Sequence, residues 1–138
     1  MVIYFCPGDF TPGCTAQANA FRDAMNKLTE LGVEVVGVSG DSAKSHELFK
    51  KDQKLNFTLL ADEEGKVARA FGVPFGKGGK VKAEDAAGEP IEIERAGTAQ
   101  RWTFIIGKDG KIAYKNNRVI PAQDAKKVTE FITEADKK

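Results

Sequence analysis

The chain has 138 residues, with 21 Lys and Arg against 20 Asp and Glu, one His and two Cys. A chain of this length can bury about two thirds of its unfolded surface in one domain, so it needs no disulfide framework. The net charge of +1 argues against nucleic-acid binding, which usually needs a strong basic excess. No apolar run approaches the ~20 residues of a membrane span. We therefore expect one soluble domain that acts in a reducing compartment.

The first half of the chain alternates between strand and helix patterns. Residues 2–6 indicate a short buried strand, and the apolar spacing from Cys14 to Leu28 indicates a helix that packs on a sheet. Thr11 suits the N-cap of this helix, and Pro12 suits its first position. The following segments predict a central strand at 33–39, a helix from Ser42 to about Leu55, a strand at 57–61 and a short helix at about 63–71.

The second half adds an insertion, two strands and a helix. Residues 75–98 begin with a Gly- and Lys-rich run, which we expect to be a loop, and continue as two alternating stretches that predict an exposed inserted hairpin. Strands at 101–106 and 111–115, joined by a glycine turn, predict an antiparallel pair. A last helix starts near Pro121. This order of elements predicts an α/β fold, with a central mixed sheet flanked by helices on both faces.

Cys14 is placed in the first turn of a predicted helix, where unpaired backbone N–H groups and the helix dipole stabilise an anion. A free thiol has a pKa of about 8.5, and a pKa of about 6 requires roughly 3.4 kcal/mol of preference for the thiolate. A helix terminus supplies about 0.3–2 kcal/mol. We therefore expect a cation from elsewhere in the fold to donate a hydrogen bond, which would add about 1.5–3 kcal/mol. The alternative is that Cys14 is a small buried residue of the core.

The run from Pro7 to Thr15, PGDFTPGCT, matches the P-x-x-x-T-x-x-C pattern of the peroxiredoxins. Its TPGCT core and the residues after it resemble the bacterioferritin-comigratory protein, or peroxiredoxin Q, subgroup of the AhpC/TSA family. The resemblance extends through VEVVGVSGDSAKSHELF, FTLLAD and RWTFIIGKDGKI, and 75–98 is a departure from it. It implies a thioredoxin-like fold, with a single thioredoxin-like peroxiredoxin domain over 1–138.

The resemblance also implies a thiol-dependent peroxidase that reduces hydrogen peroxide and organic hydroperoxides without a cofactor. Cys14 would be the peroxidatic cysteine, whose thiolate attacks the peroxide and becomes a sulfenic acid. Thr11 would orient the peroxide, Pro7 would shield the pocket from water, and Arg101 would supply the cation beside the sulfur. Gln17 would help to hold Arg101.

The residues alone leave other interpretations open at several of these positions. Arg101 would be an exposed residue at a strand end, Thr11 a simple helix cap, and Gln17 a solvated side chain. We expect the single histidine, His46, to face solvent. The cysteines and the histidine do not have the spacing of a zinc site, so no metal is expected.

Re-reduction of the oxidised sulfur needs a second thiol. Many members of the subgroup place a resolving cysteine five residues after the peroxidatic one, and that position is Asn19 here. A bond from Cys14 to the other cysteine, Cys6, would require the helix start to unravel toward a buried strand. We therefore expect a one-cysteine enzyme reduced by an external thiol, such as thioredoxin, glutaredoxin or a small thiol. Cys6 is the weaker candidate for an internal resolving residue.

The setting of the protein is also predicted. Family members carry a further segment before the strand that matches VIYF, and we expect this chain to lack it. Its loss would expose apolar surface, so we expect a monomer or a weak dimer. We expect a cytoplasmic location, with an organelle such as a plastid as the alternative. The alternative function is a thioredoxin-fold binding module without turnover, whereas a disulfide oxidoreductase would need C-x-x-C, which TPGC does not supply.

Overall fold

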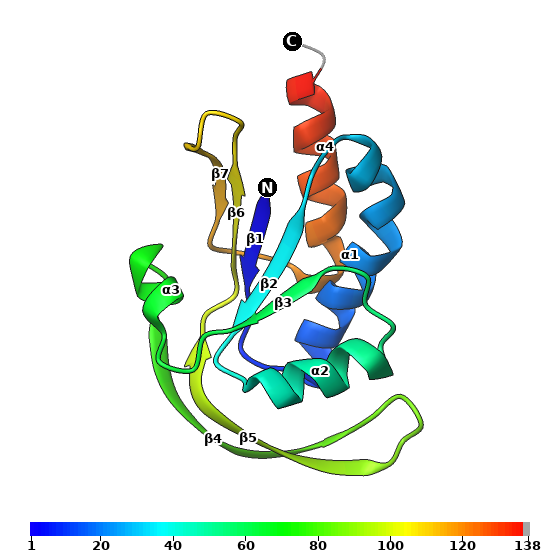
Figure 1. The fold of residues 1–138 in the computed structure, drawn as a ribbon, viewed down its shortest axis with the longest axis vertical. Coiled ribbons are helices and arrows are strands. Elements are labelled where there is room, and N and C mark those ends of the chain that lie inside the picture. The colour runs from blue at the N-terminus through cyan, green and yellow to red at the C-terminus, as the bar shows by residue number, and fades with distance from the viewer. Residues whose placement is uncertain (137–138) are drawn as a thin grey trace.

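The computed structural model describes residues 1–136 and contains a five-stranded mixed sheet in the order β3-β2-β1-β6-β7 (Figure 1). β1 lies at its centre and pairs in parallel with β2 and antiparallel with β6. The strands of this sheet are β1 (Val2–Phe5), β2 (Val35–Ser39), β3 (Thr58–Ala61), β6 (Trp102–Ile106) and β7 (Ile112–Asn116). The predicted central mixed sheet is confirmed, and β2 is an interior strand, paired on both sides.

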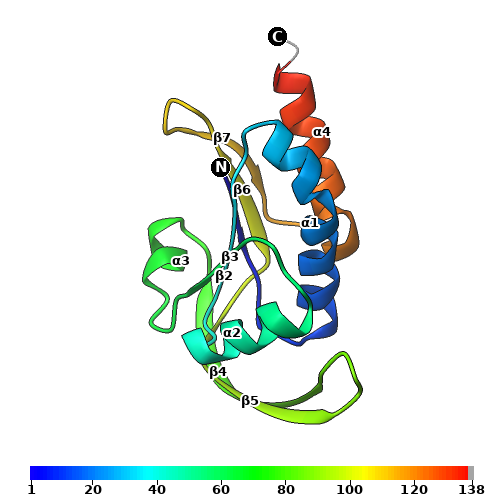
Figure 2. The same cartoon turned by 45° about the vertical axis from the view of Figure 1, so that its right-hand side comes forward.

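Helices cover both faces of the sheet. α1 and α4 lie side by side on one face, and α3 lies on the opposite face (Figures 1 and 2). The helices are α1 (Pro12–Glu30), α2 (Ala43–Asp52), α3 (Lys66–Ala70) and α4 (Asp124–Asp136), with a 3₁₀ turn η1 (Pro121–Gln123) leading into α4. No helix within residues 1–136 is both long and apolar enough to cross a membrane.

The alternation of side chains along β1 separates the core into two clusters. Successive strand residues point to opposite faces of a sheet. Tyr4 therefore enters the cluster beneath α1 and α4, where its ring stacks on Phe21 with the centroids 4.9 Å apart. Phe5 enters the cluster beneath α3, where its ring meets the edge of Phe104 at 5.9 Å. This arrangement fixes the end of β1, from which the loop to Cys14 starts.

The insertion is a long antiparallel hairpin of β4 (Phe75–Glu84) and β5 (Pro90–Ala99), as predicted. It forms a sheet of its own and curves beneath α2 (Figure 1). The expectation of a loop in its glycine-rich part is wrong, because these residues belong to β4. A Cβ on Gly78 would lie 1.9 Å from the Arg95 carbonyl oxygen, so glycine here allows a close approach of backbone to backbone.

The starts of α1 and α2 differ in how they are capped. Ser42 caps α2 as predicted, because its hydroxyl oxygen accepts the Ser45 N–H at 3.1 Å. Thr11 occupies the N-cap position of α1, but its hydroxyl does not cap the helix. It donates instead to the Gly8 carbonyl oxygen at 2.7 Å. The predicted N-cap position of Thr11 is confirmed, but its hydroxyl holds the loop before Cys14 and does not cap the helix.

Candidate active site

Cys14 lies in the first turn of α1 and faces the sheet. Its side chain is 1% exposed and belongs to the core cluster beneath α1. The sulfur also accepts two polar donors, the Gly8 backbone N–H at 3.3 Å and Arg101 Nη1 at 3.5 Å. Cys14 is therefore both a buried core residue and the centre of a polar site.

The environment of Cys14 favours its thiolate. Burial alone would raise the pKa of the thiol. A hydrogen bond from Cys6 and the charge of Arg101 lower the pKa, and hydrogen bonds from Thr11 and the Gly8 N–H lower it further, to about 6. This value lies well below the usual pKa of about 8.5 for a free thiol. Arg101 is the cation that we expected to come from a distant segment and donate a hydrogen bond to Cys14.

Thr11 and Pro7 both belong to the segment that precedes Cys14. The Thr11 hydroxyl is a hydrogen-bond partner of both Cys14 and the Gly8 carbonyl oxygen. A hydroxyl has one proton, so it donates to one of these acceptors at a time. Pro7 is half-buried and lines a pocket of about 430 Å³ together with Arg101 and Trp102. Arg101, which donates to the Cys14 sulfur, lines this pocket, so the pocket lies next to the site.

Gln17 holds Arg101 through a buried chain of hydrogen bonds. Gln17 is fully buried, and its Oε1 accepts from Arg101 Nη1 at 2.8 Å. Its Nε2 donates to Asp124 Oδ2 at 2.9 Å, and the Thr103 hydroxyl donates to the same oxygen at 2.6 Å. Burial raises the pKa of Asp124, although the hydrogen bonds from Thr103 and Gln17 lower it. Gln17 is therefore not a solvated side chain. Arg101 is held by a hydrogen-bond chain that runs through Gln17 on α1 to Asp124 on α4 and Thr103 on β6.

Cys6 lies closer to Cys14 than the sequence suggested. Cys6 is 6% exposed and belongs to the same core cluster as Cys14, and the two thiols shift each other's pKa in opposite directions. The hydrogen bond to Cys14 and burial raise the pKa of Cys6 well above its ordinary value. Both cysteines are free thiols. Asn19, at the usual resolving position, accepts a hydrogen bond from Arg22 Nη1 at 3.1 Å.

A second polar cluster surrounds Asp9, which lies in the loop that precedes Cys14. The expectation that His46 faces solvent is wrong, because its ring is buried and its Nδ1 lies 2.6 Å from Asp9 Oδ2. Its Nε2 lies 3.1 Å from the Leu60 carbonyl oxygen. His46 shares the buried face of α2 with Phe49, three positions later, and this helical spacing was the available signal.

The family model described as AhpC/TSA matches residues 1–115. This range contains the candidate site residues Pro7, Thr11, Cys14 and Arg101. The chain belongs to the AhpC/TSA family.

Relatives of this AhpC/TSA chain include plant proteins named peroxiredoxin Q, chloroplastic. The protein from Oryza sativa subsp. japonica is 43% identical over 122 residues, which are 88% of this chain and 48% of the relative. The protein from Arabidopsis thaliana is 36% identical over 135 residues, which are 97% of this chain and 55% of the relative. The chain thus spans about half the length of the curated relatives it matches.

Solved structures of other proteins share its fold. Peroxiredoxin Q from Xanthomonas campestris aligns with a TM-score of 0.77 and 29% identity, over 96% of this chain and 77% of that one. Peroxidoxin BcpB from Mycobacterium tuberculosis aligns with a TM-score of 0.76 and 28% identity, over 96% of this chain and 77% of that one. The predicted thioredoxin-like fold is confirmed.

The P-x-x-x-T-x-x-C pattern does not include the buried residues that hold Gln17, and through it Arg101, in place. Thr103 stands in the R-x-T-F segment and Asp124 begins α4, so a strand residue and a helix N-terminus were the available signals. Asp9, Asp41 and Arg95 form the other missed group. Two of these three residues follow the ends of β1 and β2, where polar residues of neighbouring parallel strands meet at one edge of a sheet.

Proposed function

We propose that this chain is a thiol-dependent peroxidase in which Cys14 reduces a hydroperoxide. The observation that carries the proposal is the buried Cys14 sulfur, which accepts hydrogen bonds from Gly8 N–H and Arg101 and has a pKa of about 6. A thiolate is the nucleophilic form of cysteine, so the site is activated at neutral pH. A structure of Xanthomonas campestris bacterioferritin comigratory protein, 28% identical with a TM-score of 0.78, concerns that protein's alkyl peroxide reduction activity. This supports organic hydroperoxides as substrates here, and we propose hydrogen peroxide as a further one.

In the first step the Cys14 thiolate attacks the terminal oxygen of the peroxide. The S–O bond forms, the O–O bond breaks, and the sulfur becomes a sulfenic acid. The leaving alkoxide or hydroxide takes up a proton and departs as alcohol or water. Arg101 donates to the sulfur and to the oxygen on which negative charge develops, while the Thr11 hydroxyl orients the peroxide. Pro7 limits the access of water to the pocket.

We propose that an external thiol then reduces the sulfenic acid. The thiol forms a mixed disulfide with Cys14 and releases water, and a second thiol restores the Cys14 thiol as it forms a disulfide with the first. Asn19 occupies the place where a resolving cysteine would stand, which supports a one-cysteine enzyme. Thioredoxin, glutaredoxin or a small thiol would serve as the reductant. Because Cys14 is 1% exposed, the first turn of α1 must open before the reductant can reach it.

A second route has the contact between Cys6 and Cys14 in its favour. In this route the Cys6 thiol attacks the sulfenic sulfur, water leaves, and an internal disulfide forms. Two thiols of an external reductant would then restore both cysteines. The two routes differ in the mass of the oxidised protein, because the first retains one oxygen until a reductant is added and the second loses two hydrogens.

The proposed function is tested by peroxide consumption in the presence of dithiothreitol. The unmodified chain is expected to consume hydrogen peroxide and an alkyl hydroperoxide, and Cys14→Ser is expected to lose this activity. Cys6→Ser is compared with it: this variant removes the other thiol but keeps a hydroxyl donor beside Cys14, so it is expected to retain Cys14-dependent consumption. A binding module would show no Cys14-dependent consumption. A single domain, a monomer or weak dimer, and a cytoplasmic location stay predictions, although the names of the plant relatives place those proteins in chloroplasts.

A further inference from the structure

The inserted hairpin carries an arginine on its inward-facing row. Buried and exposed side chains alternate along β5, and Arg95 occupies the same row as Ile91 and Ile93. Arg95 is 7% exposed. Burial of a guanidinium is unfavourable unless the group is paired and hydrogen-bonded, so an apolar residue would be the simpler choice for packing. Packing of the hairpin therefore does not account for Arg95.

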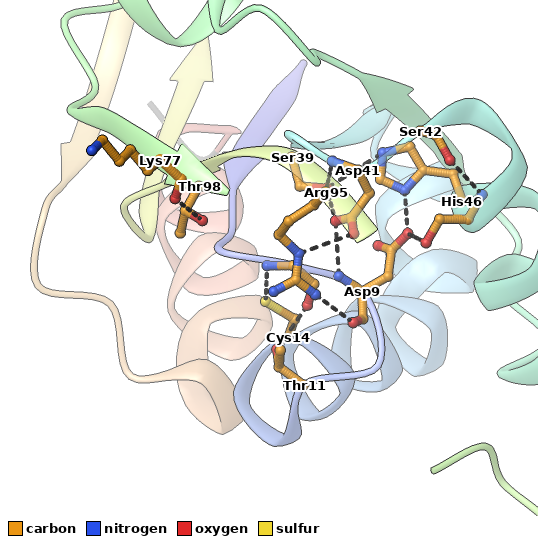
Figure 3. Close-up of polar contacts among 12 residues, drawn as sticks. Asp9, Thr11, Cys14, Ser39, Asp41, Ser42, His46, Lys77, Arg95 and Thr98 are labelled. Carbon is orange, nitrogen blue, oxygen red and sulfur yellow. Dashed lines mark hydrogen bonds and ion pairs between the residues drawn. The ribbon is translucent and has the colours of Figure 1, made fainter. Parts of the chain in front are cut away.

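Arg95 binds the loop that precedes Cys14. Its Nε donates to Asp41 Oδ1 at 3.2 Å, and its Nη2 donates to the Asp9 carbonyl oxygen at 3.2 Å. Asp41 Oδ2 accepts the Asp9 backbone N–H at 2.9 Å. The Arg95–Asp41 pair therefore binds both the backbone N–H and the carbonyl oxygen of Asp9 (Figure 3).

The guanidinium also packs directly against Gly8. A Cβ on Gly8 would lie 2.1 Å from Arg95 Cζ, so this contact requires glycine. The Gly8 N–H donates to the Cys14 sulfur, and the Gly8 carbonyl oxygen accepts from the Thr11 hydroxyl. Glycine is the most flexible residue of the backbone, and here it is held by contacts on both sides. Arg95 thus contacts Gly8, and Gly8 in turn donates a hydrogen bond to the Cys14 sulfur.

The base of the hairpin is held in place next to this contact. The Ala96 N–H donates to the Gly40 carbonyl oxygen at 3.3 Å. A Cβ on Gly40 would lie 2.1 Å from the Gly97 carbonyl oxygen, so the two backbones approach closely. Arg95 therefore projects from a part of the hairpin that is held in place. Its two hydrogen-bond partners, Asp41 and Asp9, lie after the ends of β2 and β1.

We propose that Arg95 is a positioning residue for Cys14, which fixes the Gly8–Asp9 backbone so that the Gly8 N–H points at the sulfur and stabilises the thiolate. The hairpin at 75–98 then forms part of the active site, although its sequence departs from the resemblance to the peroxiredoxin Q subgroup. The catalytic meaning of this inference rests on the proposed peroxidase function. The effect on the sulfur itself is measurable without any peroxide.

The test is a titration of the Cys14 thiolate by its ultraviolet absorbance, with Cys14→Ser subtracted in each background. The variants are Arg95→Met, which removes all donors, and Arg95→Lys, which keeps the charge but not the forked donors. Lys80→Met is the matched control, because it removes an exposed cation from the same hairpin. We expect a midpoint near pH 6 for the unmodified chain and for the control. We expect Arg95→Met to raise the midpoint by about one pH unit and Arg95→Lys to raise it by less.

Folding of each variant is checked by circular dichroism, and Arg95→Lys decides the outcome if Arg95→Met does not fold. A folded Arg95 variant with the unmodified midpoint would overturn the proposal, and so would an equal rise in Lys80→Met. Peroxide consumption is measured separately on the unmodified chain. If that chain titrates near pH 6 but consumes no peroxide, the proposed function fails while the positioning role of Arg95 stands.

Discussion

Arg101 Nη1 lies 3.5 Å from the Cys14 sulfur, although 87 positions separate the two residues in the chain. The pairing of β6 with β1 brings them together, because Arg101 directly precedes β6 and the loop to Cys14 directly follows β1. A cation at this distance stabilises the thiolate and, in the proposed reaction, the charge that develops on the departing oxygen. The antiparallel register of two strands therefore determines the reactivity of a cysteine on a helix.

The first prediction concerns the charge and the geometry of Arg101. Arg101→Met should raise the pKa of Cys14 and slow its oxidation by hydrogen peroxide at pH 7 by about 10- to 100-fold, because a charged hydrogen bond contributes about 1.5–3 kcal/mol. Arg101→Lys should restore part of the rate, since it keeps the charge. Stopped-flow kinetics would measure both rates. Equal rates for Arg101→Met and the unmodified chain would show that Arg101 takes no part in the reaction.

The second prediction concerns the buried amide of Gln17. Gln17→Leu keeps most of the volume but leaves Arg101 and Asp124 Oδ2 with one partner fewer each. The free energy of unfolding should fall by about 1–3 kcal/mol, the cost of buried polar groups that lose a partner. Urea denaturation would measure the change, with Gln123→Leu as an exposed control that should change by less than about 0.5 kcal/mol. If both variants had the unmodified stability, the hydrogen-bond chain would not contribute to folding.

The third prediction follows from the lowered pKa of Cys14. Folding favours the thiolate, so this group stabilises the native state fully above the pKa of the unfolded thiol, which is about 8.5. The contribution is lost as the pH falls through the folded pKa of about 6. The difference in unfolding free energy between the reduced chain and Cys14→Ser should therefore rise with pH over this window. A difference that is constant with pH would contradict a lowered pKa.

The fourth prediction concerns the buried pair of His46 and Asp9. Burial lowers the pKa of His46, but the hydrogen bond and charge of Asp9, with the charge of Asp41, outweigh burial and raise it. A raised pKa stabilises the native state fully below about pH 6.5, the value for an unfolded histidine. This contribution is lost as the pH rises through the folded pKa. Stability should therefore fall with pH in this window.

Cys14 titrates in an overlapping range with the opposite sign, so the histidine is tested in the Cys14→Ser background. There, His46→Gln should remove the decline of the unfolding free energy above about pH 6.5. His46 is the chain's single histidine, so no other imidazole contributes to the titration. An identical decline with and without His46 would show that the pair does not titrate on folding.

The parts of the site that sequence could predict are those defined by local pattern. Cys14 in a first helical turn, and Thr11 three positions before it, follow from spacing and helix chemistry. Arg101 and Gln17 followed from resemblance to a family, because no local rule pairs residues 84 positions apart. The order of strands and helices was predictable for the same local reasons, from apolar periodicity and glycine turns.

The parts that sequence could not predict are long-range polar contacts. Arg95 and Asp41 are 54 positions apart, and their ion pair depends on how the hairpin curves back onto the end of β2. The alternation along β5 showed which face Arg95 occupies but not what that face meets. His46 looked solvated because its neighbours are polar, whereas its partner Asp9 lies 37 positions earlier. Burial of such groups depends on partners that only the tertiary fold supplies.

The most direct test of the central claim is the intact mass of the reduced chain within seconds of adding one equivalent of hydrogen peroxide. The proposed chemistry predicts a gain of one oxygen in the unmodified chain and none in Cys14→Ser. A loss of two hydrogens would keep Cys14 as the peroxidatic residue and make Cys6 the resolving thiol in place of an external one. No rapid change in the unmodified chain, or the same gain in Cys14→Ser, would contradict the assignment of Cys14 as the residue that reduces peroxide.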